Sequence, residues 1–395
     1  MTAQDYKAPE SVGRLQTRAL TIGGIALLLS LYGVLKSPGL FYYSYLMSFL
    51  LVLGLTLGSL GLVMLQHLTS GHWGIVIRRP LESATRTLPL IAAFFLPIAF
   101  FGMKYLYGAW LNPQEVQKEP LSQFQQTYLT AGRFALRAVI YFVIWLVLMF
   151  FFNQLSKQQD LNPEDRTLRR RLKMLAGPGI ILYVFAMSFA AFDWVMSLSP
   201  HWASTIYGFL FVAGQLISSM SLMIAVVVLL ARTEPYSGIL QERHLHDLGK
   251  LLLAFVMLWA YFDFSQLLII WSGNLPEEIT FYRTRLYGGW GVVAVIVLIF
   301  HFFVPFFLLL SQNVKRSIRI LPKVALWLIL MRLVDLFWMT RPEFTSSALP
   351  TWLDLVLPIA LGGLWLGFFA FNLKQLPLLP LGDPKLAEAI EHHEH

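Results

Sequence analysis

FYYSYLMSFLLVLGLTLGSLGL, residues Phe41–Leu62, decides the fold class of this chain. The stretch contains no charged side chain. A helix needs about 20 apolar residues to cross a bilayer, and this stretch is longer than that. It opens with aromatic residues and continues into a run that contains glycine and serine, which suits close packing between membrane helices. We therefore predict a transmembrane helix that packs closely against other helices.

The composition extends this prediction to the whole chain. Of the 395 residues, 57% are hydrophobic and 13% are charged, whereas about 25% of the residues in a soluble domain are charged. The absence of cysteine excludes disulfides, thiolate zinc sites, cysteine-ligated iron–sulfur clusters and covalently attached haem. The net charge of +8 is explained by loop lysines and arginines that fix membrane topology rather than by nucleic-acid binding. We predict an all-α polytopic membrane protein with one integral membrane domain, residues 1–395.

Ten apolar runs are long enough to cross a membrane. They cover approximately residues 19–35, 41–66, 86–105, 133–153, 174–197, 202–231, 248–272, 286–311, 319–339 and 351–373. The third run contains Pro89 and Pro97, which membrane helices tolerate when neighbours satisfy the freed backbone groups. The first run has no small-residue cleavage site, so it is predicted to be a retained helix and not a signal peptide.

Loop charges predict the orientation of these helices. Most lysines and arginines lie in the N-terminal tail (1–18), in the loops after the even-numbered helices and in the C-terminal tail (374–395). By the positive-inside rule, both termini are cytoplasmic. The sixth run, HWASTIYGFLFVAGQLISSMSL, opens with aromatic residues and continues into small ones, as residues 41–62 do. This similarity predicts two four-helix bundles, residues 41–197 and 202–339. The first and tenth helices lie outside these bundles. The alternative is that the similarity between the two apolar helices arises by chance.

Ionisable and polar residues inside the predicted spans are the candidate functional residues, because they are costly in lipid and usually face a protein interior or a water-filled path. The candidates for a proton path are His301, Asp263, Gln266, Asp335, Arg332 and Asp193. Arg332 and Asp335 share a helix face, so they are placed to form an ion pair. One interpretation is a ladder of protonatable groups across the membrane. The other is that each acid pairs with an arginine or caps a helix, and titrates little.

A second set of residues lies in FDWVMSLSPHW, the predicted outer turn between the two bundles. Its structural corner residues are Asp193, Trp194, His201 and Trp202. The dipole of the preceding helix opposes an acid at that helix's C-terminus, so Asp193 is expected to have a specific partner, for which Arg137 is available. We favour a structural role for Asp193 over proton transfer. Trp194, Trp202 and Tyr207 are expected to form an interfacial aromatic belt.

Other site chemistry is not indicated by the sequence. A b-type haem needs two facing histidines at similar depth, and only His301 lies well inside a span. The chain contains no phosphate-binding loop, nucleophile elbow or HExxH pair. The C-terminal EHHEH is expected to be a solvated tail. We therefore predict no catalytic residue, cofactor or metal site in this chain.

Three stretches resemble one known family. They are AFDWVMSLSPHWASTIYGFLFVAGQ (Ala191–Gln215), YFDFSQLLIIWSGNLPEE (Tyr261–Glu278) and LPKVALWLILMRLVDLFW (Leu321–Trp338). The first is similar to the Asp-Trp-x-Met-Ser-Leu-x-Pro-His-Trp corner of the F subunit of bacterial alternative complex III, a quinol:electron-acceptor oxidoreductase. The resemblance covers the whole chain and the count of ten helices, and the corner is its most specific part.

The resemblance implies an NrfD-like fold of two four-helix bundles, helices 2–5 and 6–9, flanked by helices 1 and 10. It also implies partners: a related NrfD-like subunit with the quinol site, an iron–sulfur subunit, and multi-haem and mono-haem cytochrome c subunits. This subunit would carry no redox cofactor and would offer a proton path in the bacterial inner membrane. Two other readings stay open: a secondary transporter with a midplane polar site, and a membrane-embedded enzyme acting on lipids or quinones.

Overall fold

The computed structural model describes residues 6–383 and 385–386, and all regular elements in that part of the chain are helical. Nine of its helices are long and apolar enough to cross a membrane: Glu10–Lys36, Pro38–Thr69, Arg78–Leu106, Ala131–Leu161, Arg166–Leu198, Tyr207–Leu230, Glu242–Gly273, Gly288–Leu310 and Trp352–Leu373. The protein is therefore a polytopic helical membrane protein.

Several of these spans are built from more than one element. The long helices are α1 (Glu10–Lys36), α2 (Pro38–Thr69), α9 (Ala131–Leu161), α10 (Arg166–Trp194), α11 (Tyr207–Leu230), α12 (Glu242–Gly273), α17 (Leu321–Thr340) and α18 (Trp352–Leu373). One further span joins α3 (Arg78–Thr85), α4 (Leu88–Pro97), the π-helical turn η2 (Ile98–Gly102) and α5 (Met103–Leu106), and another joins α14 (Gly288–Val297), the π-helical turn η5 (Leu298–Phe303) and α15 (Val304–Leu310).

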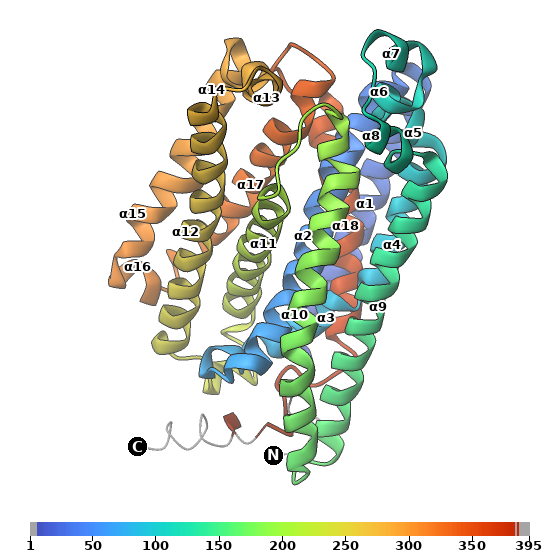
Figure 1. Ribbon diagram of the computed structural model, residues 1–395. Coiled ribbons are helices and arrows are strands. Elements are labelled where there is room, and N and C mark those ends of the chain that lie inside the picture. The colour runs from blue at the N-terminus through green and yellow to red at the C-terminus, as the bar shows by residue number, and fades with distance from the viewer. Residues whose placement is uncertain (1–5, 384, 387–395) are drawn as a thin grey trace.

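Short helices lie between the spans. They are α6 (Gly108–Leu111), α7 (Pro113–Lys118), α8 (Gln123–Tyr128), α13 (Pro276–Leu286) and α16 (Gln312–Arg316), together with the 3₁₀ turns η1 (His72–Gly74), η3 (Met196–Leu198), η4 (Tyr236–Gly238) and η6 (Arg341–Glu343). Helices α6, α7, α8 and α13 gather at one end of the molecule (Figure 1).

The predicted span at 319–339 corresponds to α17, which is not among the nine apolar helices. The reason is charge: α17 carries Lys323, Arg332 and Asp335. Arg332 and Asp335 are buried and pair with each other, so α17 places these charges inside the protein and not in lipid.

Helices α2 and α11 pack against each other at the centre of the molecule. Helices α9, α10, α3 and α4 surround α2, whereas α12, α14, α15 and α17 lie on the side of α11 (Figure 1). Helices α1 and α18 pair with each other and also contact α2. The close approach of the two central helices requires a glycine, because a Cβ on Gly58 would lie 2.1 Å from the backbone oxygen of Gln215.

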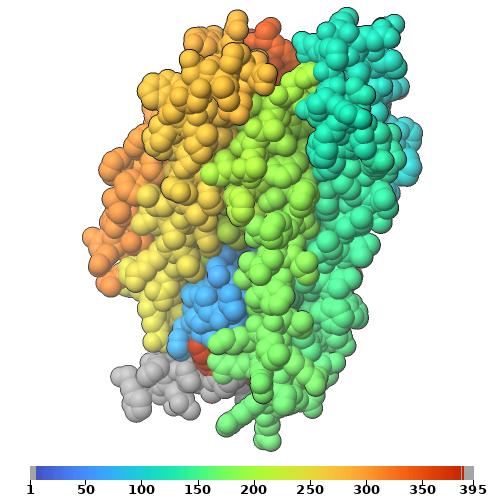
Figure 2. Space-filling model, in the orientation of Figure 1, coloured from blue at the N-terminus to red at the C-terminus, as the bar shows by residue number. Residues whose placement is uncertain are grey.

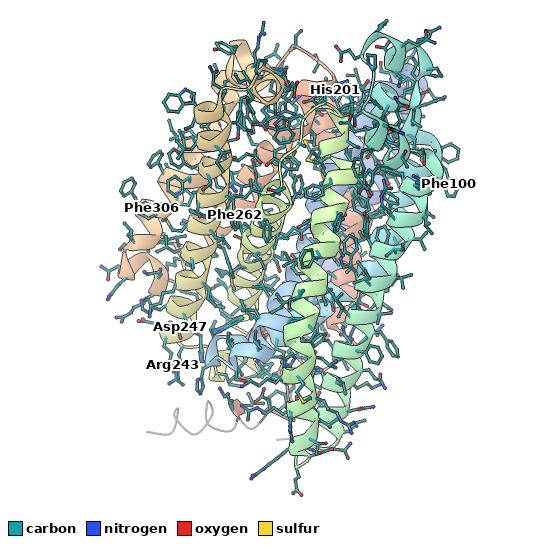
Figure 3. All side chains as sticks on the ribbon, viewed as in Figure 1. Phe100, His201, Arg243, Asp247, Phe262 and Phe306 are labelled. Carbon is teal, nitrogen blue, oxygen red and sulfur yellow. The ribbon has the colours of Figure 1, made fainter. Side chains whose placement is uncertain are left out.

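The two ends of the described chain meet at one end of the molecule (Figure 1), where the backbone N–H of Leu378 donates to the carbonyl of Tyr6 at 2.8 Å. We call this the terminal end and the opposite one the distal end. At the terminal end, the connection from α2 to α3 fills the space between α10 and α12 (Figure 2). The corner at residues 193–202 lies at the distal end, where Figure 3 labels His201.

Helix starts differ from the predicted spans. Helix α1 begins at Glu10, inside the predicted N-terminal tail, α10 begins at Arg166 and not at 174, and α12 begins at Glu242 and not at 248. Apolar runs mark only the lipid-crossing part of a helix, and the backbone hydrogen bonds continue into polar sequence. The start of α10 is set locally, because the Asp165 side chain accepts a hydrogen bond from the Thr167 N–H at 2.8 Å.

The first part of the predicted C-terminal tail is packed on the bundle. Leu378 and Leu379 are fully buried, and the Asp383 carboxylate pairs with Arg78 at 3.0 Å. The boundary predicted at residue 374 agrees with the end of α18 at Leu373, but the first residues of the tail return to the protein surface as a short packed apolar segment. The EHHEH sequence at 391–395 lies outside the described residues.

Candidate functional site

Asp193 lies at the distal end of α10 and is fully buried. Its two carboxylate oxygens accept hydrogen bonds from Nε and Nη2 of Arg137, each at 2.8 Å, and the hydroxyl of Tyr141 donates to Oδ2 at 2.7 Å. The Arg137 guanidinium also lies 3.8 Å from the ring centre of Tyr128. The charge of Asp193 is thus compensated by a bidentate arginine, and the pair joins α9 to α10.

The predicted aromatic belt was wrong. Trp194, Trp202 and Tyr207 are buried in the protein. Trp194 packs on Phe95 with ring centres 4.7 Å apart, and Trp202 stacks on Phe281 at 3.8 Å. Sequence position gave the depth of these rings along their helices, but it does not distinguish a ring that faces lipid from one that faces another helix.

Arg332 and Asp335 form the central ion pair on the side of α11. The Nη1 atom of Arg332 donates to Oδ2 of Asp335, and both side chains are buried. Helix α11 makes room for the guanidinium at Gly214, where a Cβ would lie 2.2 Å from Cζ of Arg332. Arg332 also lies over the ring of Phe211 at 5.6 Å.

His301 is fully buried beside this pair. It lies in the π-helical turn η5, and Pro305, which has no N–H, removes the ordinary helical partner of the carbonyl at residue 301. The imidazole meets the ring of Trp259 edge-on at 4.5 Å. Neither of its ring nitrogens has a hydrogen-bond partner among the described residues, so both remain able to exchange a proton.

Asp263 on α12 is partly buried and forms no hydrogen bond or ion pair with a described residue. It lies within electrostatic range of Asp335 and Tyr282. One turn further along α12, Gln266 accepts a hydrogen bond from Ser204 at 3.0 Å and donates to the Tyr282 hydroxyl at 3.1 Å. Gln266 therefore ties α12 to the corner loop and to α13.

The structure thus divides the six candidates for a proton path into two groups. Asp263, Gln266, His301, Arg332 and Asp335 lie on the side of α11, where α12, η5 and α17 meet. Asp193 lies on the side of α2 and bonds to Arg137 and Tyr141. No side-chain hydrogen bond or ion pair between described residues joins Asp193 directly to the other five.

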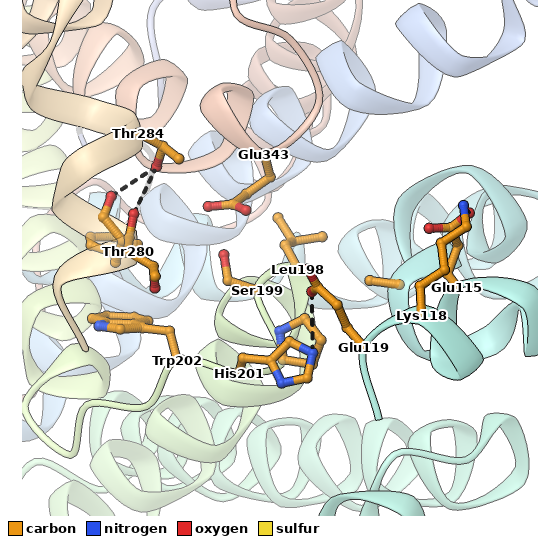
Figure 4. Close-up of a pocket in the computed structure, with 13 residues that line it drawn as sticks. Glu115, Lys118, Glu119, Leu198, Ser199, His201, Trp202, Thr280, Thr284 and Glu343 are labelled. Atoms are coloured by element: carbon orange, nitrogen blue, oxygen red, sulfur yellow. Dashed lines mark hydrogen bonds and ion pairs between the residues drawn. The ribbon is translucent and has the colours of Figure 1, made fainter. Parts of the chain in front are cut away.

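A cavity of about 480 Å³ opens at the distal end (Figure 4). Its polar wall holds Glu115, Lys118, Glu119, His201, Thr280 and Glu343. The His201 side chain is 41% exposed, and its Nε2 lies 3.5 Å from Oε2 of Glu119. Two of the four predicted corner residues, His201 and Trp202, line this cavity. His201 is exposed, whereas Trp202, like Asp193 and Trp194, is buried.

Three residues that the sequence did not mark as part of a polar path connect this cavity to the interior; two of them, Glu343 and Arg285, were not singled out at all, and Tyr207 was expected only in the aromatic belt. Glu343 on the cavity wall pairs with the buried Arg285 at 2.6 Å. Tyr207 lies within electrostatic range of that pair and of the Arg332–Asp335 pair. Arg285 lies between the predicted spans 248–272 and 286–311, where the sequence indicates only a loop charge. Arg283 and Arg285 are two positions apart in FYRTRL, and nothing in that pattern indicates which of the two side chains is buried.

A second buried ionic cluster, also missed, lies at the terminal end. Arg78 pairs with Glu82 at 3.0 Å, and Ser156 of α9 donates to the same carboxylate at 2.5 Å. Arg79 pairs with Glu82 and with Asp160. These arginines had also been treated as loop charges, but they begin α3 and are buried. The cluster joins α3, α9 and the C-terminal segment.

Comparison with known proteins adds no identification. No protein-family model matches the chain, and no curated protein matches it. The fold and the buried charges define the class: a polytopic helical membrane protein with an ionisable interior. Its particular function rests on the geometry of that interior and on the three resembling stretches.

Proposed function

We propose that the chain is a cofactor-free integral subunit of a quinol-oxidising electron-transport complex of the alternative complex III type, and that it conducts protons. One structural observation supports proton conduction. Polar groups follow one another from the distal cavity through Glu343–Arg285, Tyr207 and Arg332–Asp335 to the region of His301 and Asp263. Buried ionisable groups in membrane helices mark ion and proton paths.

The residues have different roles in this proposal. Asp263 and His301 carry protons, because neither is held by a hydrogen bond or an ion pair to a described residue. The Arg332–Asp335 pair sets the local field, and its two charges compensate each other. Asp193 is structural, because both of its oxygens are occupied by Arg137 and Tyr141.

The assembly belongs to the same proposal. The fold is NrfD-like, with two four-helix bundles flanked by the first and last spans. Both termini are cytoplasmic, and the protein lies in a bacterial inner membrane. Quinol binds mainly in a related NrfD-like subunit, and the c-type haems and iron–sulfur clusters belong to partner subunits. The absence of cysteine supports a chain that carries no electrons itself.

Purification under mild detergent tests the assembly. The tagged chain is expected to elute with proteins that carry haem absorbance and with an iron–sulfur subunit. The control is a second membrane protein carrying the same tag, purified from the same membranes. A chain that elutes alone, with no haem in the pool, would remove the respiratory-complex proposal.

Replacing Asp263 with asparagine tests the path. The variant is expected to assemble normally and to lower the number of protons taken up per electron, because asparagine cannot release a proton. The measurement is the proton-to-electron ratio of the reconstituted complex. The matched control is Asp247→Asn on the same helix, near the terminal end (Figure 3). A ratio equal to that of the wild type would leave Asp263 with only a packing role.

The secondary-transporter reading is favoured by one observation. Two spans contain π-helical turns, η2 directly after Pro97 and η5 just before Pro305. Discontinuous helices around a polar site are typical of transporters. Proteoliposomes containing only this chain would distinguish the two readings. Solute-dependent proton influx without partner subunits would favour transport, whereas no influx under any solute would favour the subunit.

A further inference from the structure

A hollow between α12 and α13 lies next to the proposed proton path, because Tyr282, which accepts a hydrogen bond from Gln266, is also part of its lining. Its volume is about 520 Å³, and it lies where α12 ends and α13 begins at the distal end. Leu267, Ile270 and Leu286 form an apolar wall, Trp271 and Tyr287 border it, and Arg283 adds one positive charge.

The hollow lies at the level of a membrane boundary. Helix α12 has 32 residues, so at 1.5 Å per residue it is about 48 Å long and exceeds the roughly 30 Å hydrocarbon core. It ends at Asn274, a left-handed cap with φ 47°. Trp271 and Tyr287 are 75% and 73% exposed, and exposed tryptophan and tyrosine at a helix end are typical of the headgroup region.

Arg283 is a cation without a partner. It is exposed and forms no ion pair or hydrogen bond with a described residue. Arg285, two positions later, is buried against Glu343, so the two arginines of α13 serve different purposes. An arginine guanidinium presents paired donors that match the oxygens of a phosphate.

We propose that this hollow binds one phospholipid, whose phosphate pairs with Arg283 and whose acyl chain lies against Leu267 and Ile270. The types of side chain that line the hollow indicate which ligand it binds. The same hollow presents a free cation, two exposed interfacial aromatic residues and an apolar wall, which match the headgroup and the acyl chain of a lipid. A free phosphate ion would leave the apolar wall without an occupant.

Native mass spectrometry of the full-length protein in detergent, after graded delipidation, tests the site. The probe is phosphatidylglycerol, compared with diacylglycerol of the same chains and with inorganic phosphate as competitor. The wild type is expected to retain one phosphatidylglycerol most strongly. Arg283→Gln is expected to weaken that binding about fivefold, the effect of one basic residue at a membrane surface.

Two further variants make the result specific. Lys104→Gln removes an exposed cation of α5 that does not line this hollow, and it should retain the lipid as the wild type does. Leu267→Trp narrows the apolar wall with Arg283 in place, and it should lose the lipid. Equal retention by Arg283→Gln and Lys104→Gln, equal binding of diacylglycerol, or displacement by inorganic phosphate would each overturn the proposal.

Discussion

Replacing Arg137 with glutamine is expected to lower the free energy of unfolding by about 3–5 kcal/mol, the usual cost of removing one partner from a buried ion pair. Asp193 is fully buried, and Arg137 supplies two of the three hydrogen bonds to its carboxylate. A glutamine cannot restore the charge or the paired geometry of the guanidinium. The remaining carboxylate would be buried with only the hydroxyl of Tyr141 bonded to it.

The measurement is reversible unfolding of the detergent-solubilised protein, followed by circular dichroism. Arg133→Gln is the matched control, because Arg133 lies one turn earlier on the same helix and is exposed; its effect should stay within about 0.5 kcal/mol. If the two variants were equally stable, the corner would not depend on the ion pair. Asp193→Asn should likewise impair assembly more than proton coupling, and the opposite result would return Asp193 to the proton path.

The sequence predicted the positions of most long apolar helices well, because lipid imposes a simple rule on each span. Residues 41–66, for example, lie within α2, and residues 351–373 nearly coincide with α18. Hydropathy alone accounts for such agreement, since a run of about 20 apolar residues has few other environments to occupy. Helix ends were less accurate, because polar turns beyond the bilayer continue the same hydrogen-bonding pattern.

Partnerships between buried charges were harder to predict. Asp193 and Arg137 are 56 positions apart, and their pairing depends on how α9 packs on α10. The sequence suggested Arg137 as an available partner but could not choose among several acids. Arg78 and Arg285 were assigned to loops, because a charge beside an apolar run usually lies in solvent. Their burial follows from tertiary packing, which no local pattern records.

The buried acids on the side of α2 have partners that Asp263 and His301, on the side of α11, lack in the described part of the chain. Around α2, the carboxylates of Asp193 and Glu82 each bond to arginine and to a hydroxyl group. Around α11, Asp263 and His301 have no such partner among the described residues. Saturated groups stabilise a packed structure, whereas unsaturated ionisable groups remain free to change protonation. This difference is why the proposed proton path runs beside α11 and not through the corner.

Replacing Gly58 with alanine is expected to destabilise the protein by about 3 kcal/mol, at the upper end of the usual range for overpacking. The added Cβ would lie 2.1 Å from the backbone oxygen and 2.6 Å from the carbonyl carbon of Gln215. A flexible side chain could move away from such a contact, but the backbone of α11 cannot. Helices α2 and α11 would have to separate, which would also strain the nearby hydrogen bond of 2.8 Å between Ser59 and Ser219.

Gly24→Ala on α1 is the matched control, because no packed neighbour lies within 4 Å of its added Cβ. It should stabilise the protein by about 0.5–1 kcal/mol, since alanine favours a helix more than glycine does. The same substitution in two helices is therefore expected to act with opposite sign, and denaturant unfolding of both variants measures it. A Gly58→Ala protein as stable as Gly24→Ala would mean that α2 and α11 lie further apart. Contact between α2 and α11 is one of the junctions between the two sides of the molecule, so proton uptake should also fall in Gly58→Ala and stay unchanged in Gly24→Ala.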